Sequence, residues 1–418
     1  MLKRELGLRG AILMGLGSMI GTGLFVSLGI ATDLAGPWVL IALILAATIA
    51  LCNGLSSARL AASHPVSGGT YEYGYRYLSP PFGFTAGWMF LLAKCASAAT
   101  AALGSMAYLF QWLGLEDNSG RWQVMAALGL LAVLTCVVLL GIRRSAQVNF
   151  VILLVTFTSV LLFVLLGIGH LQQQGGSLWS AASQPLSLKN LLQATALLFV
   201  AYAGYARIAV LAEEVKTPRR TIPRAILLTI AIVLLLYLSV TFVVLGSHDL
   251  ANRTTAASLE VVASTFGVPW LRPFIALGAI AAMVGILLNL LLGLSRVVLA
   301  MARRRDLPPL LAQIPAKGKQ PIAAILTVSG GIALLILIGN VKTTWSFSAF
   351  SVLIYYAITN LATLQLEEPQ FPRWLAVAGL ISCLGLAFWV EVEVWLSGCG
   401  LILLGLAWHY WVRRAKAV

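Results

Sequence analysis

Long apolar stretches alternate with short polar segments along the whole chain. Most of the stretches contain at least 17 residues, which is the length that a tilted helix needs to cross about 30 Å of hydrocarbon. The pattern therefore predicts an all-α membrane protein with twelve transmembrane helices. We expect them near residues 10–33, 38–62, 83–112, 122–141, 147–169, 189–211, 225–246, 273–302, 321–340, 345–365, 374–390 and 394–412.

The composition supports this interpretation and excludes other classes of protein. Hydrophobic residues make up 60% of the 418 positions and charged residues only 10%, whereas a soluble domain has about 45–50% and 25%. The surplus of Leu, Ile, Val and Ala also excludes a disordered chain. The longest polar segments have roughly 20 residues, so residues 1–418 are expected to form a single membrane domain. The five cysteines have no paired spacing, and we expect no metal site.

The formal net charge of +14 raises the question of nucleic-acid binding, and the distribution of the charges answers it. With the N-terminus inside, 20 of the 28 basic residues fall on the cytoplasmic side, five fall outside, and Lys94, Arg207 and Arg296 lie within spans. This bias is the positive-inside pattern of membrane proteins. It predicts a multi-pass protein of the inner or plasma membrane with both termini cytoplasmic, and no nucleic-acid partner.

The first predicted span contains four glycines within nine positions, at Gly15, Gly17, Gly21 and Gly23. Each glycine weakens a helix interior by about 1 kcal/mol relative to alanine, so the segment is able to unwind. Unwound backbone is tolerated at membrane depth only where it faces protein or a water-filled cavity. Its N–H groups and the following half-helix then suit a carboxylate. The alternative is close helix packing through small residues.

The sixth predicted span has a similar feature, because Gly204 lies among the aromatic residues of the segment 199–207. Interruptions in the first and sixth spans occupy equivalent positions in two halves of five helices. Such a pair is typical of inverted-repeat transporters, which bind substrate between two broken helices. We expect repeat one at about 10–170, repeat two at about 188–366 and two extra helices at about 373–412.

Five motifs in order resemble the amino acid–polyamine–organocation (APC) superfamily of permeases. They are Gly-Ser-Met-Ile-Gly-Thr-Gly-x-Phe at 17–25, Pro-Val-Ser-Gly-Gly-Thr-Tyr at 65–71, Phe-x-x-Gly-Trp at 84–88, the segment 212–226 and the segment 295–303. The resemblance implies the 5+5 inverted-repeat fold with broken first and sixth helices and two further C-terminal helices. It also implies secondary active transport of a small amino acid substrate through the lipid bilayer.

The resemblance implies a set of substrate-binding residues around the two interruptions. The substrate carboxylate would meet the backbone N–H groups of Gly21, Thr22 and Gly23. The α-ammonium would face carbonyls of both broken helices, and two aromatic residues would be walls or gates. The alternative is a packing role for Thr22 and for Phe199. The full set is Ile20, Gly21, Thr22, Gly23, Phe199, Val200, Ala201, Tyr202 and Ala203.

All 14 carboxylates lie in loops or at span ends, and a buried cationic side chain normally requires a paired carboxylate. This favours a neutral amino acid, carried by symport or exchange. The alternatives are a cationic amino acid or polyamine antiporter, whose cation would rest on aromatic faces, and a sensor or channel that does not transport. An enzyme is excluded because the sequence offers no nucleophile–base pair at membrane depth.

Five residues are expected to take part in ion coupling or in gating, namely Lys94, Thr156, Arg207, Glu213 and Glu214. Thr156 occupies the position at which relatives carry a lysine, so both H⁺ and Na⁺ remain possible coupling ions, and no other cofactor is expected. Lys94 is the deepest basic residue and the proposed titrating group; the alternative is a snorkelling anchor. The same alternative holds for Arg207. Glu213 and Glu214 belong to a cytoplasmic charge network that would lock an inner gate, or to a solvated helix end.

Overall fold

The computed structural model describes residues 7–64, 68–115, 120–141, 146–174, 185–210, 215, 217–247, 258–314, 320–367 and 372–417. The elements assigned within these ranges are helices, so the predicted all-α class is confirmed. In chain order they are α1 (Leu8–Met19), η1 (Gly23–Ser27), α2 (Leu28–Ala35), η2 (Gly36–Trp38), α3 (Val39–Ser63), α4 (Thr70–Tyr77), α5 (Pro80–Leu113), α6 (Arg121–Leu139), α7 (Ala146–Gln174), α8 (Leu188–Tyr202), η4 (Ala203–Tyr205), α9 (Ala206–Val210), α10 (Pro218–Gly246), α11 (Ser258–Ser264), α12 (Leu271–Arg303), η5 (Pro309–Ala312), α13 (Ile322–Ile336), α14 (Val341–Leu364), α15 (Arg373–Ala387) and α16 (Val392–Ala417).

Within the part of the chain that the structure describes, nine helices are long and apolar enough to cross a membrane. Three more apolar helices are shorter, namely Leu8–Met19, Ile322–Ile336 and Arg373–Ala387. One of the nine, Gly23–Ser63, covers 41 residues. It contains the C-terminal half of the first predicted span and the whole of the second. The chain is therefore a multi-pass helical membrane protein by length and composition.

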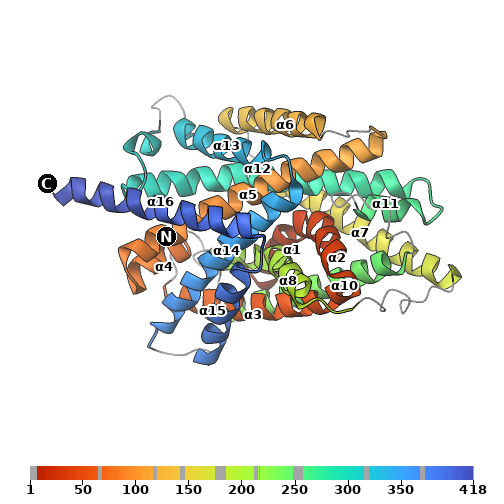
Figure 1. Cartoon of the computed structure of the whole chain (residues 1–418), viewed down its shortest axis with the longest axis horizontal. Coiled ribbons are helices and arrows are strands. Elements are labelled where there is room, and N and C mark those ends of the chain that lie inside the picture. Colours follow the sequence, from red (N-terminus) through yellow and green to blue (C-terminus); the bar gives the residue numbers. More distant parts are fainter. Residues whose placement is uncertain are drawn as a thin grey trace.

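The two longest helices, α5 and α12, contain 34 and 33 residues and pack against each other. In Figure 1 they run along the long axis of the molecule, with α6 and α13 at one edge and α3 and α15 at the opposite edge. The inner part of α5, from Cys95 to Ser105, is buried and apart from Leu103 consists of small residues. Small side chains let helix backbones approach closely where no hydrophobic effect separates them from lipid.

Buried polar pairs fix α14 against its neighbours. The hydroxyls of Ser97 on α5 and Ser348 on α14 lie 2.8 Å apart. The side-chain amide of Asn360 on α14 donates a 2.6 Å hydrogen bond to the amide oxygen of Asn53 on α3. Polar groups without water need partners inside the protein, so these pairs hold one arrangement of the helices. That arrangement encloses α8, which packs against both α3 and α14.

Candidate functional site

The first apolar stretch is interrupted where its glycines predict it. Helix α1 ends at Met19, and Ile20 has extended backbone angles of φ −81° and ψ 97°. The next helical segment opens with hydrogen bonds of 3.0 and 2.9 Å from the N–H groups of Leu24 and Phe25 to the carbonyl of Gly21. The N–H groups of the residues just before Leu24 thus occupy a first turn, which has no acceptor inside the helix.

Two tyrosine hydroxyls hold the chain on either side of this interruption. Tyr237 of α10 donates a 2.8 Å hydrogen bond to the carbonyl of Met19. Tyr108 of α5 donates a 2.9 Å bond to the carbonyl of Phe25. Both tyrosines are fully buried, so each supplies a partner to a carbonyl that water does not reach. Hydrogen bonds from α10 and α5 therefore stabilise the interrupted conformation.

The sixth predicted stretch is distorted over a shorter length. Helix α8 ends at Tyr202, one 3₁₀ turn covers Ala203–Tyr205, and α9 continues from Ala206. The N–H of Ala203 donates to the carbonyls of Phe199 and Val200. The carbonyl of Ala203 accepts a 3.3 Å bond from the hydroxyl of Tyr356. The same carbonyl also accepts the N–H of Ala206, so of the Val200 and Ala203 carbonyls the one of Val200 keeps a lone pair for an ammonium.

The two interrupted segments lie in direct contact. A Cβ atom added at Gly23 would come within 2.7 Å of the Cβ and 2.8 Å of the Cα of Ala201, and within 3.0 Å of the hydroxyl of Tyr237. A Cβ at Gly204 would meet the carbonyl of Ser18 at 2.8 Å. Only glycine allows these backbones to approach so closely. The packing brings the expected residues of both spans into one region.

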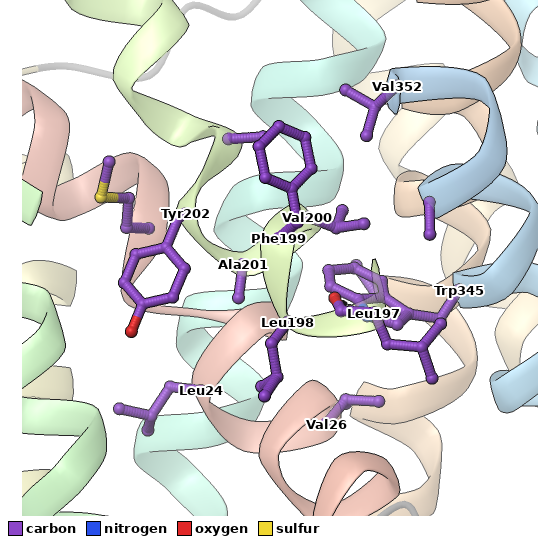
Figure 2. Packing of buried hydrophobic residues seen from close by; sticks show 14 of the residues in the cluster. Leu24, Val26, Leu197, Leu198, Phe199, Val200, Ala201, Tyr202, Trp345 and Val352 are labelled. Atoms are coloured by element: carbon purple, nitrogen blue, oxygen red, sulfur yellow. Dashed lines mark hydrogen bonds between the residues drawn. The ribbon is translucent and has the colours of Figure 1, made fainter. Parts of the chain in front are cut away.

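The aromatic residues of α8 line this region. Figure 2 shows Tyr202 and Trp345 on opposite sides of the turn that carries Leu198–Ala201. The ring of Tyr202 contacts Tyr237 at 5.3 Å between centroids, and Phe199 meets Tyr356 edge-on at 5.5 Å. Trp345 donates a 3.0 Å bond to the carbonyl of Leu197. These aromatic residues are buried.

Two hydroxyls beside the contact have no hydrogen-bond partner among the described residues, those of Thr22 and Tyr202. Both side chains are buried, at 3% and 0% exposure. Buried polar groups are nearly always paired in folded proteins, with protein, water or ligand. The hydroxyls of Thr22 and Tyr202 are next to Gly23 and Ala201 in the sequence, so they are candidate polar contacts for a ligand in an otherwise apolar region.

A cavity of about 330 Å³ reaches the interruption from one side. It lies along the C-terminal half of α1 and includes Ile20. A Cβ added at Gly21 would collide with the side-chain end of Ile286 from α12, so this isoleucine stands between the cavity and the interruption. The lining residues are Leu13, Met14, Gly17, Ser18, Ile20, Phe150, Ile152, Leu153, Thr156, Arg207, Ala282, Gly285, Ile286 and Asn289.

The expected coupling residues occupy different places. Thr156 lines the cavity and donates a 3.4 Å bond to the carbonyl of Gly278. Arg207 also lines the cavity and is exposed. Lys94 is half-buried in α5, away from the residues that line the cavity. Glu213 and Glu214 lie outside the described residues.

Beyond the interruption, the short helix α11 packs against η1, α5 and α12. Its Glu260 is fully buried and pairs with Arg272 of α12, with 2.9 Å between Oε1 and Nε. Arg272 also donates to the carbonyl of Gln111 at the end of α5. Burial raises the pKa of Glu260 to about 7, against the opposing effect of Arg272. This ion pair fastens α11 over the segment that follows the interruption.

A second polar cluster joins α4, the end of α12 and α16. Asp306 accepts hydrogen bonds of 2.5 Å from Tyr71 and 2.8 Å from Tyr75, and lies 3.5 Å from Nδ1 of His409. Burial, and then the bond to Asp306, raises the pKa of Tyr71. Tyr71 closes one of the five sequence motifs, and its role here is to tie three helices together.

The sequence-based reasoning missed Tyr237, Ile286 and Asn289. A single tyrosine in the apolar run of α10 was a usable signal, because its hydroxyl needs a partner. Asn289 was another signal, since a polar residue within a span is usually functional or paired. Nothing in the sequence marked Ile286, which is one aliphatic residue among many in α12.

These features define a multi-pass helical membrane protein with an interrupted helix at the end of a one-sided cavity. The model of the amino acid permease family matches residues 10–417, and the chain belongs to this family. Permeases are transport proteins and not enzymes, as the sequence predicted.

Three relatives illustrate the range of the family. An uncharacterized transporter of Mycobacterium tuberculosis is 40% identical over 429 aligned positions, which cover 99% of this chain and 92% of the relative. The branched-chain amino acid permease BcaP of Bacillus subtilis is 26% identical, covering 99% and 90%. Cationic amino acid transporter 4 of Mus musculus is 28% identical, covering 89% of this chain and 61% of its own length.

Proposed function

We propose that the protein is a secondary active transporter that moves neutral amino acids across the plasma membrane by alternating access. The observation that carries the proposal is the pair of unpartnered buried hydroxyls, Thr22 and Tyr202, beside the interruption of α1. The carboxylate of the substrate would bind the first-turn N–H groups of Gly21–Gly23, where the helix dipole is positive. Its ammonium would face the backbone carbonyls of Ile20 and of Val200 and Ala201 at the end of α8.

The cavity supports one step of such a cycle. It meets the interruption from the side of α1, while beyond the interruption Ala201 packs on Gly23 and α11 packs on η1. A site that is reached from one face at a time is the requirement of alternating access. We take this arrangement as the inward-facing state, because the proposed topology puts the start of α1 in the cytoplasm.

The proposed topology has twelve spans in a 5+5 inverted repeat followed by two helices. Each of the twelve apolar stretches coincides with a helix or a consecutive series of helices. The first and sixth are the ones that change helix type near their middle. The charge bias then sets both termini in the cytoplasm.

A neutral side chain is favoured because no carboxylate lines the described part of the cavity. The relative named a branched-chain amino acid permease agrees with this choice. Cationic amino acid transport is the second candidate, since other relatives carry that name. For coupling we propose H⁺ or Na⁺, with Lys94 and Thr156 as the groups involved, and an inner gate at Glu213 and Glu214.

Counterflow in proteoliposomes tests the proposal. Vesicles loaded with an unlabelled neutral amino acid should accumulate the labelled form transiently, because a carrier exchanges substrate across its alternating site. A thermal-shift screen of the purified protein with the twenty amino acids and common polyamines selects the substrate, since a bound ligand raises stability by mass action. Binding without trans-stimulation would instead indicate a sensor or channel.

A further inference from the structure

Among the described residues that line the cavity beside the interruption, one is ionisable. Of its fourteen described lining residues, only Arg207 carries a charge, and Ser18, Thr156 and Asn289 are the polar ones. The other walls are aliphatic, aromatic or glycine. A guanidinium within a span is costly unless water or an anion compensates it. The cavity therefore suits a ligand with an anionic group and an apolar body.

Some polar side chains of the cavity form hydrogen bonds within the described part of the protein and others do not. The hydroxyl of Ser18 donates to the carbonyl of Met14 at 2.8 Å, and that of Thr156 donates to Gly278. Arg207 and Asn289 form no side-chain hydrogen bond or ion pair with another described residue. They come from α9 and α12, on different walls of the same cavity. A guanidinium offers two parallel N–H groups that match the two oxygens of a carboxylate.

We infer that Arg207, with Asn289, forms a carboxylate-binding subsite on the inner part of the transport path. This inference rests on the proposed function and adds to it. An amino acid that leaves the N–H groups of Gly21–Gly23 would pass Ile286 and bind its carboxylate to Arg207. Its aliphatic side chain would contact the apolar walls. The fixed positive charge would also repel cationic side chains, which disfavours cationic amino acids as substrates.

The volume of the cavity agrees with this assignment. About 330 Å³ lies at the lower end of the range for small-molecule sites, which is about 300–1,000 Å³. A snorkelling arginine would direct its charge to the membrane surface. Arg207 is exposed and also borders a cavity that contains Ile20 of the interruption, so a snorkelling position is not the one place open to its guanidinium.

Site-resolved labelling of the wild-type protein tests the subsite directly. Phenylglyoxal modifies guanidinium groups, and peptide mass spectrometry follows Arg207 separately from Arg224, an exposed arginine of α10. L-leucine at about ten times its Kd should slow labelling of Arg207 about tenfold, by mass action. L-leucinamide has the same side chain and ammonium but no carboxylate, so it should not protect. Labelling of Arg224 should not change.

Two results of this experiment would overturn the inference. The first is a labelling rate of Arg207 that leucine does not change, or that leucinamide slows equally. The second is protection of Arg207 by phosphatidylglycerol vesicles without any amino acid, which would assign the site to a lipid phosphate. The experiment uses the folded wild-type protein, so a misfolded variant cannot produce either result.

Transport kinetics from the two faces give an independent measurement. Arg207→Gln should raise KM about tenfold for uptake from the cavity side, as expected for one lost charge-assisted hydrogen bond. Arg207→Lys should restore most of the affinity, and Arg224→Gln should leave KM unchanged. An unchanged KM in Arg207→Gln would overturn the inference while the proposed function stands. If the wild-type protein exchanges no neutral amino acid at all, the proposed function fails instead.

Discussion

The hydroxyl of Tyr237 donates a 2.8 Å hydrogen bond to the carbonyl of Met19, the last residue of α1. The two residues are 218 positions apart in the chain. This bond supplies a partner to a carbonyl that the interruption leaves without an intrahelical donor. It also places the ring of Tyr237 against Tyr202. One side chain thus links the end of α1 to the aromatic wall of α8.

Tyr237→Phe should destabilise the protein by about 1–3 kcal/mol, because a buried carbonyl loses its donor. The substrate KM should rise as well, since the bond holds the interruption in place. Thermal unfolding in detergent and proteoliposome uptake measure the two effects. Ser239→Ala is the matched control, because the hydroxyl of this half-buried serine of α10 donates to Leu235 of its own helix. Equal stability and KM in Tyr237→Phe and wild type would contradict the assignment.

Gly23→Val should abolish transport while membrane insertion persists. The added side chain would overlap Ala201 and the hydroxyl of Tyr237, and overpacking of this kind costs about 1–3 kcal/mol. Uptake should fall below about a tenth of the wild-type rate, the equivalent of 1.4 kcal/mol. Gly129→Ala is the control, because a Cβ there meets nothing within 4 Å. Wild-type uptake with normal expression of Gly23→Val would refute the site.

Neutral amino acids should bind at least about tenfold more tightly than arginine, lysine or putrescine. The reason is that a cationic group would lack a carboxylate partner in the cavity, whose one charged residue among those described is Arg207. Competition against a labelled neutral substrate gives the ratio of dissociation constants. A dication that binds more tightly than every neutral amino acid would favour the cationic antiporter instead.

Lys94→Met should flatten the pH dependence of exchange and leave substrate Kd within about twofold of wild type. Lys94 is half-buried in α5 and is not among the residues that line the cavity. A proton-coupled carrier needs one titrating group that senses the transport path. Lys189→Met, at the exposed start of α8, is the control. A variant with the wild-type pH profile would reduce Lys94 to a snorkelling anchor.

Thermal stability should fall as the pH rises from about 4.5 to about 7, because of Glu260. The pKa of this carboxyl is raised from 4.5 to about 7 in the folded protein. Between these values the folded state binds more protons than the unfolded state, so stability decreases with pH. Glu260→Gln should flatten this slope, whereas Glu393→Gln, at an exposed position of α16, should keep it. Calorimetric or fluorescence melting curves at several pH values measure this dependence of stability on pH. An unchanged slope in Glu260→Gln would disprove that Glu260 causes it.

The sequence by itself determined the helical class and the family. Apolar stretches of spanning length predict helices because the bilayer demands internal hydrogen bonding of every backbone group. The interruption at Ile20–Gly23 was also predictable, because glycine weakens a helix locally, without help from distant residues. Such features depend on composition and on neighbours in the chain.

Only the tertiary structure decided what surrounds the interruption. Helices that are hydrophobic all round carry little information about which face meets which partner. The bond from Tyr237 to Met19, the position of Ile286 against Gly21 and the meeting of Arg207 with Asn289 in one cavity depend on packing between remote segments. The sequence predicted a broken sixth helix, and the structure has a single 3₁₀ turn there, Ala203–Tyr205, in a segment packed against α3 and α14.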